Sequence, residues 1–244
     1  MDNFPAFADY LLVLIFGILL PFISGVKSAA AFKDMQLAFD SPTKKRFYLG
    51  NSFFLFIIAF VIVVVWGLYQ RPFSELGFTT AEAAGKRTPW WMIGLFVALY
   101  TMDIIHSITD EDEREETRDR LEEQTPFMPS KWRELPAYTI MCISAGVFEE
   151  IVFRGFLITF FRYLFAGFPA GAAWAVITPA IIFSLAHYYQ GSKAVFKILV
   201  LSLLFGMIFW HSGSLVAVII LHFLLDLVSG ILSIQLSKNK DEVQ

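Results

Sequence analysis

Long hydrophobic blocks make up most of this chain, and short polar stretches separate them. A helix needs about 20 mostly apolar residues to cross the hydrocarbon core of a bilayer, and seven blocks approach that length. They cover residues 10 to 26, 48 to 68, 90 to 105, 136 to 165, 171 to 189, 194 to 210 and 215 to 236. The pattern predicts an all-α protein, a polytopic membrane helix bundle with about seven transmembrane helices.

The composition agrees with a membrane protein and narrows the function classes. Of the 244 residues 57% are hydrophobic and only 17% are charged, against about 25% charged in soluble domains. A net charge of −3 without a basic, aromatic-rich patch gives no sign of nucleic acid binding. Cys142 is the single cysteine, which excludes an intramolecular disulfide and a Cys-based zinc site. We therefore expect the lipid bilayer, and no nucleic acid, as a partner; the oligomeric state stays open.

Lys and Arg are distributed unevenly between the predicted loops. Fourteen lie in the first, third and fifth loops and the C-terminal tail, whereas the opposite side has only Arg71, Lys86, Arg87 and Arg162. Cytoplasmic loops are enriched in Lys and Arg, so the N-terminus is predicted outside and the C-terminus in the cytoplasm. The short loops favour a bacterial cytoplasmic membrane.

One stretch, from Asp110 to Glu123, is strongly charged. Its acids and bases at i,i+4, Asp110 with Arg114 and Glu116 with Arg120, predict a solvated cytoplasmic helix. The alternative is a lid or docking surface. This stretch belongs to a predicted cytoplasmic loop, residues 108–133. The loop lies at the end of an N-terminal three-helix membrane region (1–135). A four-helix membrane core (136–244) follows, for which we predict a polar catalytic cavity.

The fourth block contains three ionisable residues, Glu149, Glu150 and Arg154. A charge at the centre of a membrane helix costs at least about 2.5 to 3.5 kcal/mol, so such residues indicate a functional site. Glu150 and Arg154 are at i,i+4 and are predicted to form an ion pair. Glu149 is displaced by about 100° around the helix, which leaves it free to face a cavity. We assign proton transfer to Glu149 and an orienting role to the other two.

Two further blocks provide imidazoles and a carboxylate. His187 lies near the end of the fifth block, and Pro179 is expected to bend that helix. His222 and Asp226 are at i,i+4 and share a face of the seventh block. His187 lies within about five residues of the predicted cytoplasmic end, so either the span continues past Tyr189 or the cavity is tilted and open to the cytoplasm. We favour the second, because hydrolysis inside a membrane needs water.

These residues also allow other interpretations. Membrane histidines often only join helices, and the Glu149, Glu150 and Arg154 cluster could serve packing alone. A proton-coupled transporter uses intramembrane Glu, His and Asp as a relay, although the chain lacks the paired repeats expected of one. A catalytically silent membrane scaffold is the third class. Glu149, His187 and His222 together could hold Zn²⁺, although no His-Glu-x-x-His motif is present.

At these residues the sequence resembles the CPBP (Abi/CAAX) intramembrane protease family, which includes the Ras-converting CAAX endopeptidases. The family pattern reads Glu-Glu-x-x-x-Arg, Phe-x-x-x-His and His-x-x-x-Asn or Asp. The corresponding runs here are Glu149-Glu150-Ile-Val-Phe-Arg154, Phe183-Ser-Leu-Ala-His187 and His222-Phe-Leu-Leu-Asp226. All three stand in the right order on successive apolar blocks, from about residue 136 to 236.

The resemblance implies an intramembrane endopeptidase that hydrolyses a peptide bond of a membrane-associated or lipidated peptide or protein. The resemblance implies that Glu149 and His187 polarise a water for attack on the scissile carbonyl. It also implies that His222 and Asp226 lie beside the oxyanion that forms on this carbonyl, and that Glu150 and Arg154 support the site. The CAAX endopeptidases carry Asn where Asp226 stands, and Asp can donate a hydrogen bond to an oxyanion only when protonated. Asp226 therefore either donates in that form or orients His222. The resemblance favours a glutamate-dependent mechanism without metal, with zinc as the alternative.

Overall fold

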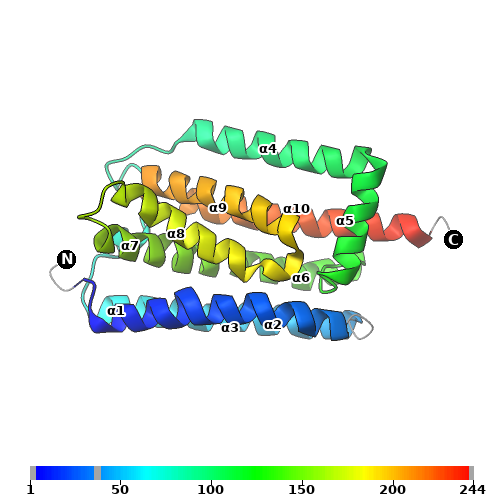
Figure 1. Ribbon diagram of the computed structural model, residues 1–244, viewed down its shortest axis with the longest axis horizontal. Coiled ribbons are helices and arrows are strands. Elements are labelled where there is room, and N and C mark those ends of the chain that lie inside the picture. Colours follow the sequence, from blue (N-terminus) through cyan, green and yellow to red (C-terminus); the bar gives the residue numbers. More distant parts are fainter. Residues whose placement is uncertain (1–3, 36–39, 242–244) are drawn as a thin grey trace.

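The computed structural model describes residues 4–35 and 40–241, and within these ranges the chain is helical and has no strand (Figure 1). Helix α1 (Phe7–Leu12) continues through a π-helical segment (Val13–Leu19) into α2 (Leu20–Met35). The other helices are α3 (Ser41–Leu68), α4 (Trp90–Thr109), α5 (Glu111–Glu123), α6 (Leu135–Ser144), α7 (Ile158–Leu164), α8 (Gly171–Ala186), α9 (Ser192–Ser212) and α10 (Val216–Asp241). The seven predicted blocks coincide with helical structure apart from Phe165, His187 and Leu215, which lie just outside helices.

Five helical stretches of the described residues are long and apolar enough to cross a membrane. They are Phe7–Lys27, Ser41–Leu68, Trp90–Thr109, Ser192–Ser212 and Val216–Ser237, while α8 is a shorter apolar helix. The predicted all-α membrane bundle is thus confirmed, and the protein is an integral membrane protein. The count of seven spans is not confirmed, and the orientation and the division at residue 135 stay predictions.

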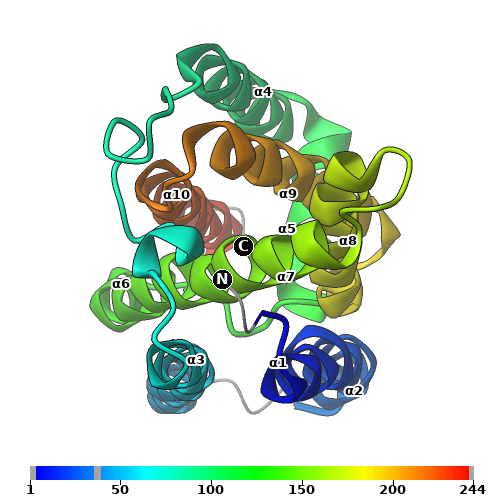
Figure 2. The same ribbon diagram turned by 90° about the vertical axis from the view of Figure 1, so that its left-hand side faces the viewer.

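The helices form layers on both sides of one central helix (Figure 2). That helix consists of α6, two π-helical segments (Ala145–Glu149 and Ile151–Leu157) and α7, which follow one another without a break from Leu135 to Leu164. Its start packs on α3 and α10, and its end packs on α8. Helices α1 to α3 lie on one side, α9 and α10 on the other, and α4 lies outermost beside α9.

Large apolar side chains of the central helix fix these layers. Phe156, Leu157 and Phe160 are almost completely buried and belong to one core cluster with Trp66 of α3. Fully burying such a side chain contributes about 1.5 to 3 kcal/mol. The segment of the central helix from Glu150 to Phe161 is buried throughout, so its polar residues face other helices.

Helix α5 crosses one end of the bundle, roughly perpendicular to the other helices (Figure 1). It confirms the predicted charged helix, but its contacts differ from those expected. Asp110 accepts a hydrogen bond from the Glu113 amide at 3.0 Å, and Arg114 lies 3.9 Å from Glu111 instead of pairing with Asp110. Glu116 binds Lys193 at the start of α9, 2.7 Å away. The predicted partner of Glu116, Arg120, has a side chain outside the described part of the structure.

Candidate active site

The two adjacent glutamates lie where the central helix departs from α-helical geometry. Glu149 ends the first π-helical segment, and Ile151, one residue after Glu150, begins the second. π-Helical turns inside helices are rare and occur frequently at functional sites. They widen the helix locally, so the offset of about 100° expected between the two glutamates for a regular α-helix does not apply strictly here.

Glu150 and Arg154 form the predicted ion pair. Arg154 Nη1 donates to Glu150 Oε1 at 2.7 Å, and both side chains are almost completely buried. Arg154 Nη2 donates to Ser202 Oγ of α9 at 2.9 Å. A buried guanidinium requires such partners, because an unpaired charge in a low-dielectric interior is strongly destabilising.

His222 of α10 binds the same carboxylate oxygen. Its Nδ1 lies 2.7 Å from Glu150 Oε1, and the residue is only 7% exposed. A carboxylate accepts hydrogen bonds, so this contact places a proton on Nδ1 and fixes the direction of the ring. The motif pattern suggested only that Glu150 supports Arg154, whereas the structure shows that it also orients His222.

The other ring nitrogen of His222 faces two carboxylates. Nε2 is 3.8 Å from Glu149 Oε2 and 3.6 Å from Asp226 Oδ2. Both distances exceed that of a direct hydrogen bond, so Nε2 is close to two carboxylates without being bonded to either. The side chains of Glu149 and Asp226 are 19% and 26% exposed, against 0% for Glu150. The predicted proton-transfer residue is therefore the more accessible of the two glutamates.

His187 stands directly after α8, which ends at Ala186. A short 3-10 helix, Tyr188–Gln190, follows it, so where the fifth span ends stays a prediction. The Nδ1 atom of His187 lies 2.8 Å from the Phe183 carbonyl, which accepts a hydrogen bond from it. This leaves Nε2 of a neutral ring as an acceptor. The Phe183 ring connects the two histidines, with centroid distances of 4.7 Å to His187 and 6.1 Å to His222.

Aromatic rings enclose the buried charges. The Arg154 guanidinium lies 4.9 Å from the Phe183 ring centre and 5.4 Å from that of Phe205. The Tyr189 ring lies beside His187, with ring centres 6.0 Å apart. The sequence did not predict the contacts of Ser202 and Phe205, because a serine or a phenylalanine in an apolar block gives no sign of a distant arginine.

No group of three His, Cys, Asp or Glu side chains that could hold a metal ion occurs among the described residues. Whether Glu149, His187 and His222 bind zinc, the alternative considered from the sequence, stays a prediction. We derive no chemical step through a metal.

The arrangement unites the three sequence motifs at one place within the membrane. Glu149, Glu150 and Arg154 come from the central helix, His187 from the end of α8, and His222 and Asp226 from α10. Residues 131–228 match the family model described as type II CAAX prenyl endopeptidase Rce1-like. The Rce1-like region contains all six predicted site residues, and the match confirms the resemblance to CAAX proteases.

The Rce1-like match covers the central helix, α8, α9 and the first half of α10. It supports an intramembrane protease of the CAAX type. No curated protein and no solved structure matches the chain.

Proposed function

We propose that the protein is an intramembrane endopeptidase that hydrolyses a peptide bond of a membrane-associated or lipidated peptide or protein, with a water that Glu149 and His187 activate. The observation that carries the proposal is the placement of Glu149, 3.8 Å from His222 Nε2, inside a protein-enclosed part of a membrane bundle. The Rce1-like match of the surrounding residues supports the reaction class and a lipidated substrate.

Proton transfer begins at Glu149. Its carboxylate takes a proton from water as the water oxygen attacks the scissile carbonyl carbon, and later gives this proton to the departing amine. His187 supports the attack, because its Nδ1 is engaged with the Phe183 carbonyl and its Nε2 accepts a second hydrogen bond from the same water. The two residues then fix both the position and the direction of the nucleophile.

His222 stabilises the charge that develops on the carbonyl oxygen. With Nδ1 bound to Glu150, the imidazolium form of His222 presents an Nε2–H donor on the side of Glu149 and Asp226. Such a fixed donor in a dry site contributes more than it would in water. Asp226 is too far from Nε2 to orient the ring directly, so Glu150 performs that function with Arg154 holding Glu150 in place.

The substitution Glu149→Gln tests this function, because it preserves the shape of the side chain and removes the base. We expect cleavage to fall by at least about 10²- to 10⁴-fold while the protein stays folded. The measurement compares the membrane proteomes of cells that carry the wild type and the variant, since an uncut substrate accumulates only with the variant. Glu82→Gln, at an exposed loop carboxylate, is the control and should cleave normally.

The outcomes separate the rival functions. If the protein were a transporter, Glu149→Gln would abolish proton-coupled flux and no uncut substrate would accumulate. If it were a scaffold, the Glu149→Gln variant would keep its function. Purified protein that stays active after exhaustive chelation, with no stoichiometric metal by elemental analysis, supports the glutamate-dependent step. Activity that chelation abolishes and zinc restores would overturn that step but not the protease assignment.

A further inference from the structure

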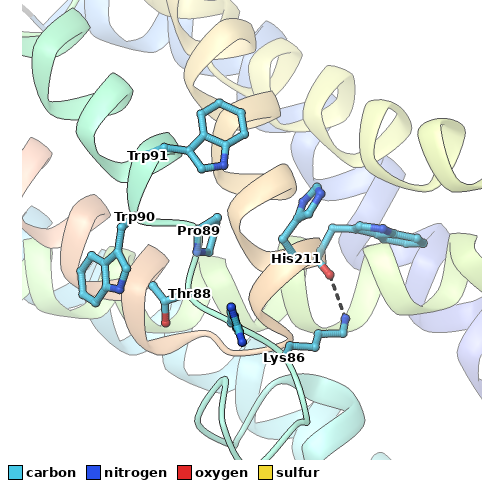
Figure 3. A pocket seen from close by; sticks show the side chains of 8 residues that line it. Lys86, Thr88, Pro89, Trp90, Trp91 and His211 are labelled. Carbon is cyan, nitrogen blue, oxygen red and sulfur yellow. Dashed lines mark hydrogen bonds between the residues drawn. The ribbon is translucent and has the colours of Figure 1, made fainter.

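A pocket lies at the end of the bundle away from α5, at a distance from the candidate active site. It has a volume of about 610 Å³ and is formed by the loop before α4, the start of α4 and the end of α9. Its lining residues are Lys86, Arg87, Thr88, Pro89, Trp90, Trp91, Trp210 and His211. Figure 3 shows Lys86, Pro89 and His211 around this hollow.

We expect the pocket at the level of the lipid headgroups, because of the helix ends that form it. Two apolar helices able to cross a membrane have one end at this pocket. They are Trp90–Thr109, which begins there, and Ser192–Ser212, which finishes there. Trp90 and Trp91 are 73% and 67% exposed. Exposed Trp at the ends of membrane helices is typical of the interface, where its ring contacts both headgroups and acyl chains.

The charges that line the pocket are all basic. Lys86 Nζ donates to the Trp210 carbonyl at 2.8 Å, the bond drawn in Figure 3, and so caps the end of α9. Arg87 is exposed and makes no hydrogen bond or ion pair with another residue in the described ranges. His211 uses Nδ1 for the Met207 carbonyl, which leaves Nε2 for another partner.

The electrostatics around Lys86 favour an added anion. Partial burial and the charge of Arg162 lower the pKa of Lys86, and Glu75 offsets this only in part. Glu75 is itself paired with Arg162. Since no acidic residue lines the pocket, an anion placed there meets attraction from two cations without repulsion at short range.

We propose that this pocket binds the headgroup phosphate of an anionic phospholipid. Arg87 binds the phosphate with its planar guanidinium, and the three indoles contact the glycerol and the upper acyl chains. A lipid fits better than a soluble anion, because the pocket adjoins the lipid-facing side of two membrane helices and the exposed tryptophans would contact only water on a soluble ligand. A bound lipid would also hold α4 against α9, the helix that carries Ser202.

Binding to the purified, full-length protein in detergent tests the proposal. Native mass spectrometry and the melting temperature are measured with phosphatidylglycerol, with phosphatidylcholine and with inorganic phosphate. We expect phosphatidylglycerol to remain bound and to raise the melting temperature, and the other two to do neither. Arg87→Gln should weaken phosphatidylglycerol binding by at least about tenfold, because one charged hydrogen-bonding group is lost.

Arg46→Gln is the matched control. Arg46 is an exposed cation near the start of α3, outside this pocket, so its loss removes the same net charge and should leave binding unchanged. Equal retention of both lipids, or equal binding by wild type and Arg87→Gln, would overturn the proposal. Displacement of phosphatidylglycerol by inorganic phosphate at similar concentration would identify a free-anion site instead. Because the readout is lipid binding, it is independent of proteolysis.

Discussion

One oxygen atom of Glu150 joins the central helix to α10, and Arg154 extends this connection to α9. Its Oε1 accepts from Arg154 Nη1 and contacts His222 Nδ1, both at 2.7 Å, and Arg154 extends the chain to Ser202 of α9. Glu150 Oε2 has no hydrogen-bond partner among the described residues. Both partners of Glu150 therefore share its other oxygen, so a shift of this carboxylate affects Arg154 and His222 together.

The substitution Ser202→Ala should reduce activity through the arginine. It removes the 2.9 Å bond that holds Arg154 Nη2, so Glu150 and then His222 lose positional support. We expect kcat to fall more than KM rises, because the oriented donor acts in the transition state. The loss of stability should be about 1 to 2 kcal/mol, as expected for a hydrogen bond to a charged group in a membrane protein. Ser202→Thr should restore most of both.

A matched control for this substitution is Ser52→Ala. The Ser52 hydroxyl is buried and has no hydrogen-bond partner among the described residues, so its removal should leave stability unchanged or improved. If Ser202→Ala and Ser52→Ala behaved alike in activity and unfolding, Ser202 would have no positioning role.

At the scale of elements, a polar cluster fastens the start of α3 to the start of the central helix. Glu134, at the end of the 3-10 turn Trp132–Glu134, accepts a short hydrogen bond from Ser41 and one of 2.9 Å from the Ser130 amide. Lys44 Nζ lies 3.5 Å from Glu134 and donates to the Met128 carbonyl at 2.6 Å. These bonds fix where the central helix begins, and therefore the height of its glutamates.

The stability of this junction should depend on pH. Burial disfavours the ionised form of Glu134, but its hydrogen bonds and Lys44 outweigh that effect and lower its pKa. The unfolded pKa is about 4.3, so the stabilisation is complete above that pH and is lost as pH falls through the lower folded value. Glu134→Gln should therefore reduce stability by about 1 to 2 kcal/mol at neutral pH, and the difference should vanish in acid.

Melting curves of wild type and Glu134→Gln in detergent, recorded from pH 3 to pH 8, provide the measurement. Glu82→Gln should show no such pH-dependent difference, since Glu82 is exposed in a loop. A difference between wild type and Glu134→Gln that stayed constant across the range would contradict an ionised Glu134 as its source.

Local patterns predicted the helices, and the i,i+4 rule predicted the contact between Glu150 and Arg154. Contacts between distant elements could not be predicted in this way. Nothing in the sequence indicates that Glu150 binds His222, or that Glu116 binds Lys193, because each contact depends on how two helices pack. The π-helical segments were also missed, since they result from packing around the central helix and not from residue propensity.

At the scale of the whole molecule, the candidate site and the outer helices α1 to α3 lie on different sides of the central helix. The candidate site lies between the central helix, α8, α9 and the first half of α10, which fall within the Rce1-like match. Helices α1 to α3 cover the opposite side of the central helix (Figure 2). A change confined to that outer layer should therefore alter the stability of the bundle more than the rate of cleavage.

A buried ion pair in the outer layer allows this to be tested. Asp9 of α1 is fully buried and binds Arg71, which follows α3, through two hydrogen bonds of 2.8 Å. Arg71→Met leaves the Asp9 carboxylate uncompensated and should reduce stability by about 3 to 5 kcal/mol. The double variant with Asp9→Asn removes the charge, keeps an acceptor for the Ala6 amide, and should recover most of that loss.

Unfolding of the two variants, together with cleavage per folded molecule, provides the measurement. A double variant as unstable as the single one, or a cleavage rate that falls with stability, would show that this layer acts on the site itself.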